Sequence, residues 1–426
     1  MMICPNCFAQ TFDGKKCTSC RYIVKGERSV EDLRQFFLLK NRYVIGHSIG
    51  AGGFGITYAA LDKLKNIRVC VKEYFPASLA VRDQDGVVVR SARQSYEEDF
   101  KGGIRRFLEE ARVIEEMEHI PGVVRVTDCF EENGTAYYVM EFLDGATLKS
   151  LVPEHGMELR AAYAIIMRVG RILDTIHKEK GYLHRDVSPE NIMILPTGRV
   201  VLIDFGNAKN YFMCSSGYSM TLRHGFAPIE QYSGEDIQGP FTDLYALAST
   251  FYYMLTGKVI PRATERLTGT EYEPLTALRP DIAQEISDIV DRALTIQPSE
   301  RTRTVGDFLK ALASVLVTRS DEEGCVHVSV SIDGAVQEQY TIEEDKEYIV
   351  GRSEMCDIVF PNCENVSKRH CRLTFDSKSK QFCIEDFSTN GTYVNYVRLE
   401  KETKYYAGPQ DLIILANTRF RLILGE

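Results

Sequence analysis

The pattern of apolar residues changes twice along the chain, and this feature restricts most strongly how it can fold. Residues 1 to about 24 are rich in Cys, Gly and Lys and too few to form a core of their own. From about Asn41 to Thr318, short alternating strands give way to longer helical periods, and short strands then return. A chain of 426 residues also exceeds what one hydrophobic core usually serves. We expect three domains, at 1–24, 41–318 and 325–426, with linkers at 25–40 and 319–324.

The composition narrows the classes of protein to which the chain can belong. Apolar residues make up 44% of the sequence, as in globular proteins, and the net charge of −9 argues against broad binding of nucleic acid or anionic membranes. No run approaches the ~20 apolar residues of a membrane span, and residues 1–4 lack the features of a signal peptide. We therefore expect a soluble, cytoplasmic protein with reduced cysteines.

Four of the 12 cysteines form two Cys-x-x-Cys pairs near the amino terminus, with nine residues between them. Two such turns can place four thiolates around one zinc ion, and in so short a segment the metal would supply most of the folding energy. The pattern resembles a zinc ribbon, so we expect a structural zinc site with the ligands Cys4, Cys7, Cys17 and Cys20. The alternatives are redox-active or incidental cysteines, and a ribbon that binds nucleic acid through Lys15, Lys16 and Arg21.

A glycine-rich stretch follows at residues 50–55, Gly-Ala-Gly-Gly-Phe-Gly, which fits the pattern G-x-G-x-x-G. Dinucleotide-binding folds share this pattern, but there the glycines open a helix. Here residues 56–58 are β-branched and aromatic, so we expect a strand–turn–strand hairpin whose backbone N–H groups can approach phosphates. The candidate nucleotide-binding glycines are Gly50, Gly52, Gly53 and Gly55.

The next strand ends in Lys72, in the sequence Val-Cys-Val-Lys, which fits the pattern V-A-I-K. Its ammonium would reach the α and β phosphates of a nucleotide, and an amphipathic helix around residues 104–114 can offer it a carboxylate. We choose Glu110 as the partner of Lys72. Residues 82–86 have the character of an inserted hairpin. The other glutamates near Glu110 are Glu109, Glu115 and Glu116.

The most informative chemical pattern is His-Arg-Asp at residues 184–186, with Asn191 five residues past the aspartate and Asp-Phe-Gly at 204–206. Phosphoryl transfer from ATP needs a carboxylate to orient the acceptor hydroxyl, and Asp186 can provide it. It also needs an amide and a second carboxylate to hold magnesium, which Asn191 and Asp204 can provide. The segment therefore indicates an ATP-dependent phosphoryl-transfer site.

Together these motifs resemble the eukaryotic-type serine/threonine protein kinase domain in its bacterial version, over residues 41 to about 315. Ala-Pro-Ile-Glu at 227–230 also resembles the A-P-E motif with one residue inserted. The resemblance implies an α+β bilobal fold, ATP and Mg²⁺ as cofactors, and protein hydroxyl groups as substrates. It further implies that Asp243 braces the catalytic loop and that Arg301 pairs with Glu230.

The roles that the resemblance implies follow from charge. Lys72 and two Mg²⁺ ions held by Asp204 and Asn191 would neutralise the triphosphate, while Asp186 would accept the proton of the attacking hydroxyl. Arg185 would anchor a phosphorylated activation segment. The candidate phosphorylation sites in that segment are Ser215, Ser216, Ser219, Thr221, Tyr211 and Tyr218.

One residue departs from the pattern of the family. Serine/threonine kinases usually carry lysine two residues after the catalytic aspartate, and this chain has Ser188, so a cation beside the transferring phosphate is missing. Slow transfer, a cation supplied from elsewhere, and a pseudokinase that binds nucleotide without turnover all remain open. Because the lysine, the base and both magnesium ligands are retained, we expect an active enzyme.

After residue 325 the alternation predicts an all-β sandwich, with strands at 326–332, 348–350, 371–375 and 420–424. Three motifs lie at strand ends, where the loops of a sandwich gather: Gly351-Arg352, Ser367-Lys368-Arg369-His370 and Asn390-Gly391. They match the signature of forkhead-associated (FHA) domains, and this resemblance implies a reader of phosphothreonine. A sandwich without a phosphopeptide site is the alternative.

The residue types of these motifs suit recognition of a phosphopeptide. Arg352 would bind the phosphate, Ser367 would donate its hydroxyl, and Asn390 would hold the peptide backbone. His370 would brace the loops, and Gly391 would serve a turn that needs positive φ. The candidates for secondary contacts are Arg369, Thr389 and Asn395.

A kinase and a phosphothreonine reader on one chain suggest a signalling enzyme that phosphorylates itself and protein substrates. The reader would bind either its own chain or substrates that the kinase has marked, and effective concentration favours the first wherever the linker can reach. Thr221 is the most attractive internal ligand, because the reader should discriminate threonine from serine. The competing class is an inactive scaffold that responds to phosphorylation.

Overall fold

The computed structural model contains two compact units. The first comprises Met1–Asp144, Thr175–Asp186 and Leu202–Cys214, and the second comprises Gly145–Asp174, Val187–Val201 and Ser215–Glu426. The residues that the structure describes are 2–24, 29, 31–53, 55–195, 198–210, 222–233, 238–317, 326–332, 335–360, 363–376, 379, 381–394, 397–408, 411–416 and 420–424.

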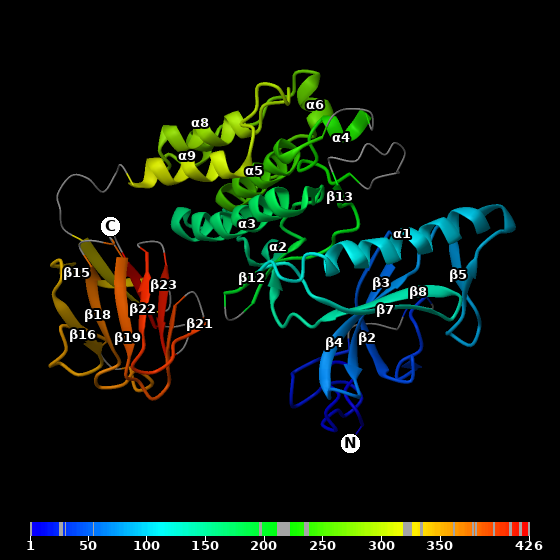
Figure 1. The fold of residues 1–426 in the computed structure, drawn as a ribbon, viewed down its shortest axis with the longest axis horizontal. Coiled ribbons are helices and arrows are strands. Elements are labelled where there is room, and N and C mark those ends of the chain that lie inside the picture. The colour runs from blue at the N-terminus through cyan, green and yellow to red at the C-terminus, as the bar shows by residue number, and fades with distance from the viewer. Residues whose placement is uncertain are drawn as a thin grey trace. The chain divides into compact units, whose positions relative to one another are not determined.

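The first unit is built on a six-stranded antiparallel sheet in the order β1-β2-β3-β4-β8-β7 (Figure 1). Strands β2 and β3 form the hairpin that the glycine-rich stretch predicts, with Gly52 opposite Gly55. The strands are β1 Leu38–Leu39, β2 Tyr43–Gly52, β3 Gly55–Asp62, β4 Ile67–Tyr74, β7 Val126–Glu132 and β8 Thr135–Glu141.

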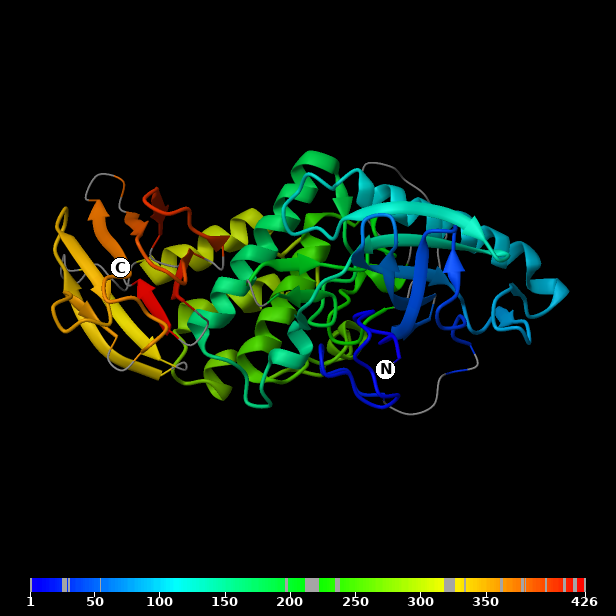
Figure 2. The same cartoon turned by 90° about the horizontal axis from the view of Figure 1, so that it is seen from below.

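Helix α1, Glu97–Glu115, lies along this sheet and packs against β4, β7 and β8 (Figure 2). Its first turn is acidic, which complements the positive end of the helix dipole, and its apolar stripe is buried. A one-turn 3₁₀ helix, Gln94–Tyr96, precedes it. The sequence therefore positions the helix that carries Glu110 by ordinary amphipathic packing.

The inserted hairpin that the sequence predicts near residues 82–86 is present as β5, Ala80–Arg82, and β6, Val89–Ser91. Arg82 Nη1 donates to Glu73 Oε1 on β4 at 3.0 Å, and both side chains are almost fully buried. The hydroxyls of Tyr58 and Tyr137 also donate to Glu73, each at 2.8 Å. The insertion is thus fixed to β4, the strand that contains Lys72.

The cysteine-rich segment packs against β2. The backbone N–H of His47 donates to Pro5 O at 3.1 Å, and the ring of Tyr22 lies 4.4 Å from that of His47. Gly46 lies so close to the segment that an added Cβ would come within 2.0 Å of Pro5 O, so only glycine fits there. Internal bridges join Met2 to Phe12, Phe12 to Cys17, and Lys16 to Ile23.

The second unit contains a helical part centred on α5, Pro240–Thr256, whose residues from Thr242 onward are all buried. Proline in its first turn and Gly257 in the left-handed conformation, with φ +70°, define its two ends. The other helices are α2 Leu148–Leu151, α3 Leu159–Lys180, α4 Glu230–Ser233, α6 Ala263–Leu267, α7 Leu275–Leu278, α8 Gln284–Ala293 and α9 Val305–Val317. The short strands β9 Ala146–Thr147, β11 Ile192–Ile194 and β12 Val200–Leu202 form one small sheet. In the first unit, β10 Tyr182–Leu183 pairs with β13 Lys209–Asn210.

The carboxy-terminal part is the all-β sandwich that the alternation predicts (Figure 1). One sheet has the order β15-β14-β24-β23-β20-β21 and the other β17-β16-β18-β19-β22, with one apolar core shared between them. The first sheet comprises β14 Val326–Ile332, β15 Ala335–Ile342, β20 Thr392–Val394, β21 Val397–Arg398, β23 Leu412–Leu415 and β24 Phe420–Leu424. The second comprises β16 Glu347–Gly351, β17 Ile358–Val359, β18 Cys371–Asp376, β19 Gln381–Asp386 and β22 Lys404–Ala407.

The fold class predicted from the sequence is confirmed for its α+β bilobal domain and its β-rich carboxy-terminal region. Among the described residues, no helix has the length and apolar character needed to span a membrane.

Candidate functional site

Three predicted site residues meet in the first unit. Lys72 lies on β4, and its Nζ donates to Glu110 Oε1 at 3.1 Å and to Asp204 Oδ1 at 3.0 Å. Glu110 lies on the inner face of α1, where its side chain is 10% exposed, whereas the neighbouring Glu109 is 64% exposed and pairs with Arg112. The structure therefore brings Lys72 to Glu110 and not to Glu109.

Tyr138 on β8 completes this cluster, although no sequence motif pointed to it. Its hydroxyl donates to Glu110 Oε1 at 2.9 Å, and its ring packs against Phe107 and lies 5.4 Å from Lys72 Nζ. Glu110 Oε1 therefore accepts two hydrogen bonds, which hold the carboxylate toward the lysine. No local sequence pattern distinguishes Tyr138 from the other core tyrosines of this sheet.

The electrostatics of the cluster favour a charged lysine. Burial opposes the charge, but Asp204 and Glu110 more than compensate, so the pKa of Lys72 lies well above its ordinary value. The positive charge of Lys72 in turn lowers the pKa of Asp204. Burial raises the pKa of Glu110, and Lys72 opposes that rise. An ammonium held between two carboxylates in this way can neutralise the phosphates of a nucleotide.

The His-Arg-Asp and Asp-Phe-Gly segments are joined by hydrogen bonds. Buried His184 donates from Nε2 to Ile203 O at 3.2 Å and accepts at Nδ1 from the backbone N–H of Asp186 at 3.3 Å. Its ring lies 4.6 Å from that of Phe205. Arg185 and Asp204 both adopt left-handed backbone conformations, with φ of +64° and +63°, which non-glycine residues hold only under structural constraint.

The glycines of the β2–β3 hairpin fall into two groups. An added Cβ at Gly50, Gly52 or Gly53 would meet no atom within 4 Å, so the tip of the hairpin faces open space. At Gly55 the Cβ would come within 2.3 Å of Glu73 O, so that glycine is required by packing. The three glycines at the tip therefore leave room for phosphate groups against the backbone.

Asn191 lies in the second unit, where its backbone N–H donates to Ser188 O at 3.0 Å and its side chain is almost fully buried. In the same unit, Arg223 Nη1 forms an ion pair with Glu190 Oε2. The candidate phosphorylation sites between residues 211 and 221 lie outside the described residues.

The ion pair that the resemblance implies in the helical part is present. Arg301 Nη1 donates to Glu230 Oε1 at 2.8 Å, and both side chains are fully buried. The same guanidinium also donates to the carbonyls of Phe241, Thr295 and Ile296. Each of its three nitrogens therefore takes part in a hydrogen bond. Asp243 is buried in α5, and its role as a brace for the catalytic loop stays a prediction.

The four amino-terminal cysteines form one cluster, in which every Sγ atom lies within 4.8 Å of the others. The Sγ atoms of Cys4 and Cys20, and those of Cys7 and Cys17, are 3.7 Å apart. A tetrahedral zinc ion with Zn–S bonds of about 2.3 Å requires sulfur separations of roughly 3.8 Å. The donor set and its spacing therefore fit zinc.

Polar groups around the cluster also favour metal binding. A hydrogen bond from Thr11 lowers the pKa of Cys17 to about 6, whereas burial raises that of Cys7 to about 12. Asn6 contributes two further contacts, from its backbone N–H to Cys4 Sγ at 3.4 Å and from Nδ2 to Cys20 Sγ at 3.5 Å. Such donors stabilise the thiolate form that a metal requires.

In the sandwich, three loops carrying predicted contact residues lie side by side. The N–H of Arg352 donates to Ser367 O at 3.0 Å, and Ser367 Oγ accepts from the N–H of Thr389 at 3.1 Å. Asn390 Nδ2 donates to Asn365 O at 2.8 Å. The side chains of Arg352, Arg369, Thr389 and Asn390 are exposed, and Asn395 lies outside the described residues.

His370 connects two of these loops through its imidazole ring. It is fully buried, accepts at Nδ1 from the N–H of Ser367 at 3.0 Å, and donates from Nε2 to Gly391 O at 3.1 Å. This pair of bonds requires the neutral imidazole, and burial lowers the pKa of His370. Gly391 has a φ of +95°, the positive value predicted for its turn.

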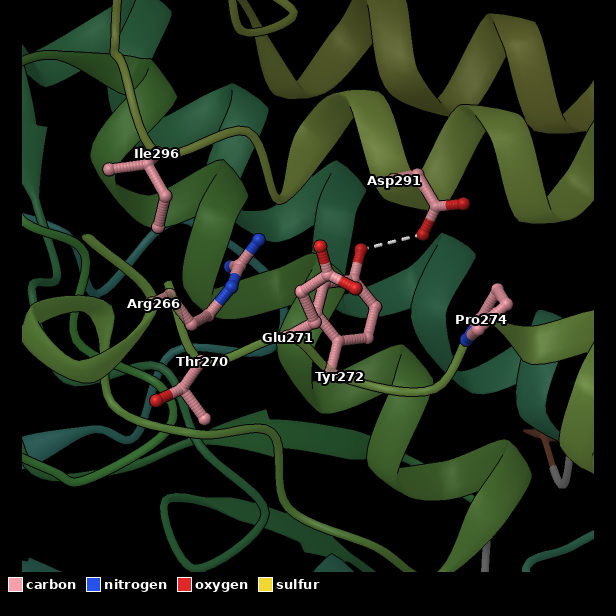
Figure 3. Close-up of a pocket in the computed structure, with 7 residues that line it drawn as sticks. All are labelled: Arg266, Thr270, Glu271, Tyr272, Pro274, Asp291 and Ile296. Carbon is pink, nitrogen blue, oxygen red and sulfur yellow. Dashed lines mark hydrogen bonds between the residues drawn. The ribbon is translucent and has the colours of Figure 1, made fainter. Parts of the chain in front are cut away.

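A separate pocket of about 300 Å³ lies in the helical part (Figure 3). Tyr272 Oη donates to Asp291 Oδ1 at 2.6 Å across it, and Arg266 lies 4.6 Å from the ring of Tyr272. None of the site residues predicted from the sequence lines this pocket. The remaining lining residues are Thr270, Glu271, Pro274 and Ile296.

Comparison with known families agrees with this geometry. The protein kinase domain family matches residues 43–311, which is more than half of the chain, and the FHA domain family matches residues 348–416. The chain therefore belongs to the protein kinase family, and it carries an FHA domain in its carboxy-terminal part.

The relatives are bacterial serine/threonine kinases. Serine/threonine-protein kinase PknA of Mycobacterium tuberculosis is 33% identical over 293 residues, covering 66% of this chain and 63% of PknA. Serine/threonine-protein kinase F of Synechocystis is 28% identical over 320 residues, covering 71% of this chain and 58% of the relative. A solved structure titled "PpkA-294 apo form" matches with a TM-score of 0.56 and 34% identity, covering 66% of this chain and 99% of that chain. The chain thus spans less than two thirds of the length of these curated relatives.

Proposed function

We propose that the chain is an active ATP-dependent protein kinase that phosphorylates serine or threonine in itself and in protein substrates. The observation that carries this proposal is the contact of Lys72 with both Glu110 and Asp204, because phosphoryl transfer in kinases requires the lysine–glutamate pair and the aspartate of Asp-Phe-Gly to be in place together. Ser188, in place of the usual lysine, is the one feature that favours a nucleotide-binding scaffold.

The proposed roles of the residues follow from their contacts and charges. Lys72, oriented by Glu110, binds the α and β phosphates, and Gly50, Gly52 and Gly53 leave space for the backbone to cover them. Asp204 and Asn191 would hold Mg²⁺, which supplies neutralisation of the phosphate charge when bound. Asp186 orients the acceptor hydroxyl and takes its proton.

The test is incubation of the purified chain with Mg²⁺ and labelled ATP beside an Asp186→Asn variant, with phosphorylated residues mapped by mass spectrometry. Label on serine or threonine that disappears in the variant is the expected result. If wild type binds ATP without transferring label, the scaffold function replaces the enzyme.

We further propose that the FHA domain binds phosphothreonine peptides. Support comes from the exposed Arg352 beside Ser367, and from the hydroxyl of Ser367 lying against the loop of Thr389 and Asn390. Arg352→Ala should lower the affinity of the full-length chain for a phosphothreonine peptide by at least about tenfold. Equal binding of matched phosphoserine and phosphothreonine peptides would contradict the proposed specificity.

The ligand of the FHA domain can belong to the chain itself or to substrates. The candidate within the chain is phosphorylated Thr221, since a tethered ligand gains effective concentration. Replacing Thr221 by Ala should then make the FHA domain of the phosphorylated chain more available to an added phosphothreonine peptide. Unchanged peptide affinity would favour substrates as the ligands.

The amino-terminal segment is proposed to bind one structural zinc ion through Cys4, Cys7, Cys17 and Cys20. The proposed domain boundaries are those expected from the sequence, with the zinc segment at 1–24, the kinase domain at 41–318 and the FHA domain at 325–426.

A further inference from the structure

The catalytic loop itself offers no cation after its aspartate. From Asp186 to Asn191 the sequence is Asp-Val-Ser-Pro-Glu-Asn, which contains two carboxylates and no basic residue. Catalysis of phosphoryl transfer is almost entirely positioning and neutralisation of the charge on the phosphate oxygens. A loop of this composition therefore depends on positive charge from another segment.

Ser188 does not meet this need. Its side chain is fully buried, and its hydroxyl has no hydrogen-bond partner within the part of the chain that the structure describes. A hydroxyl carries no net charge and cannot replace an ammonium beside a phosphate. A buried polar group without a partner in a catalytic loop also calls for an explanation beyond packing.

Arg223 brings a cation to this loop from a segment 33 residues away. Its guanidinium pairs with the carboxylate of Glu190, two residues after Ser188. The side chain of Arg223 remains 30% exposed in this position. A guanidinium has five N–H donors in a fixed plane, so one arginine can bind a carboxylate and a phosphate at the same time.

The backbone around Arg223 is held firmly. Its carbonyl accepts from the N–H groups of Phe226 at 3.1 Å and Ala227 at 2.9 Å, which closes a turn. Gly225 in this turn has a φ of +81°, and its carbonyl accepts from Ser249 Oγ of the buried helix α5 at 2.6 Å. Phe226 is buried and contacts the ring of Tyr253. The turn therefore presents Arg223 from a rigid base.

We propose that Arg223 supplies the positive charge that Ser188 lacks and stabilises the transferring phosphate, with Glu190 orienting its guanidinium. In the step concerned, the acceptor oxygen bonds to the γ phosphorus as the bond to the β–γ bridging oxygen breaks. ADP leaves with that electron pair, and Asp186 takes the hydroxyl proton. Arg223 forms no covalent bond and keeps its protons. The inference rests on the kinase activity proposed above.

The first test replaces Arg223 by Met and by Gln in the full chain and measures phosphorylation of casein at saturating Mg-ATP. Both variants should lose roughly 100-fold in kcat, as expected when one stabilising donor is removed from a transition state. The KM for ATP should change by less than about threefold. Arg303→Met, at an exposed arginine of the same unit, should leave both parameters unchanged.

The second test separates a catalytic cation from a structural ion pair. In the Arg223→Met background, Ser188→Lys should raise kcat at least about tenfold, because it returns a positive charge to the catalytic loop. Glu190→Gln keeps Arg223 and should lower kcat less than Arg223→Met does. A merely structural pair would give equal defects for the two single variants and no rescue by lysine.

Three results would overturn the inference: full kcat in the Arg223 variants, no rescue by Ser188→Lys in a variant that still binds Mg-ATP, or loss of Mg-ATP binding in both Arg223 variants. A wild-type chain that binds Mg-ATP but never transfers phosphate would overturn the proposed function together with the inference. An active wild type with unaffected Arg223 variants would overturn the inference alone.

Discussion

Glu109 and Glu110 are adjacent on one helix, and only the direction of the side chain separates their roles. Glu110 points inward to Lys72 and Tyr138, whereas Glu109 is solvated beside Arg112. Glu110→Gln should therefore lower kcat/KM roughly 100-fold, because it removes the charge that orients Lys72. Steady-state kinetics with Glu109→Gln as the matched control should show less than about a twofold change for the control. Similar losses in both variants would contradict the assignment.

At His370 the hydrogen bonds fix one protonation state. The ring accepts from Ser367 and donates to Gly391 O, so protonation at Nδ1 would break the first bond. Burial lowers the pKa of His370 in the folded chain below its value in the unfolded chain. The contribution of His370 to the free energy of unfolding is therefore fully present above about pH 6.5 and is lost as the pH falls toward the folded pKa.

An NMR titration of the full chain should therefore show His370 titrating below its ordinary value. Hydrogen exchange of the sandwich strands should quicken over the same range of pH. A His370 that titrates at or above about pH 6.5 would contradict the neutral, buried state.

At the scale of elements, the inserted β5–β6 hairpin depends on one buried ion pair with β4. Arg82 is 1% exposed and Glu73 is 0% exposed, and Arg82 also donates to the carbonyls of Glu31 and Val87. Arg82→Met would leave a buried carboxylate without its cation, at a cost of roughly 3–5 kcal/mol. Native-state hydrogen exchange of β4 and β5 should report this loss.

The control for this prediction lies in the same hairpin. Arg90 pairs with Asp83 at 2.8 Å but is 68% exposed, so Arg90→Met should cost less than about 1 kcal/mol. Adding Glu73→Gln to Arg82→Met should recover part of the stability, because no unpaired charge then remains buried. Equal effects of the Arg82 and Arg90 variants would show that the buried pair contributes little.

At the scale of the whole molecule, the cysteine segment connects a metal site to the sheet that carries the glycine hairpin. Its contacts with Gly46 and His47 lie on β2, the strand that continues into Gly50 and Gly52. Removal of zinc by a chelator should unfold residues 2–24, since a segment of this size has little core of its own. Hydrogen exchange should then quicken at His47 as well.

Metal analysis provides the matched control for the zinc site. Cys7→Ser should lower the zinc content of the purified chain, whereas Cys129→Ser, at a half-buried cysteine of β7, should leave it unchanged. A zinc-free chain with unaltered hydrogen exchange in residues 2–24 would contradict a structural role for the metal.

Local signals in the amino-acid sequence are sufficient to predict several features of this protein. Paired cysteines, a strand–glycine–strand pattern, the His-Arg-Asp and Asp-Phe-Gly motifs and the alternation of Val326–Ile332 each depend on chemistry or periodicity within a few residues. The strands expected at 326–332 and 420–424 accordingly lie where the structure has β14 and β24. The class of each domain can be predicted because several such motifs occur in it together and in a characteristic order.

Contacts between residues from distant segments become visible only in the folded chain. Glu73 and Arg82 form a buried pair, Tyr138 fixes Glu110 from another strand, and Gly46 is required by a segment some forty residues earlier. The approach of Arg223 to Glu190 is of the same kind. A sequence pattern shows which face of an element is buried, but the partner on that face is chosen by packing across the fold.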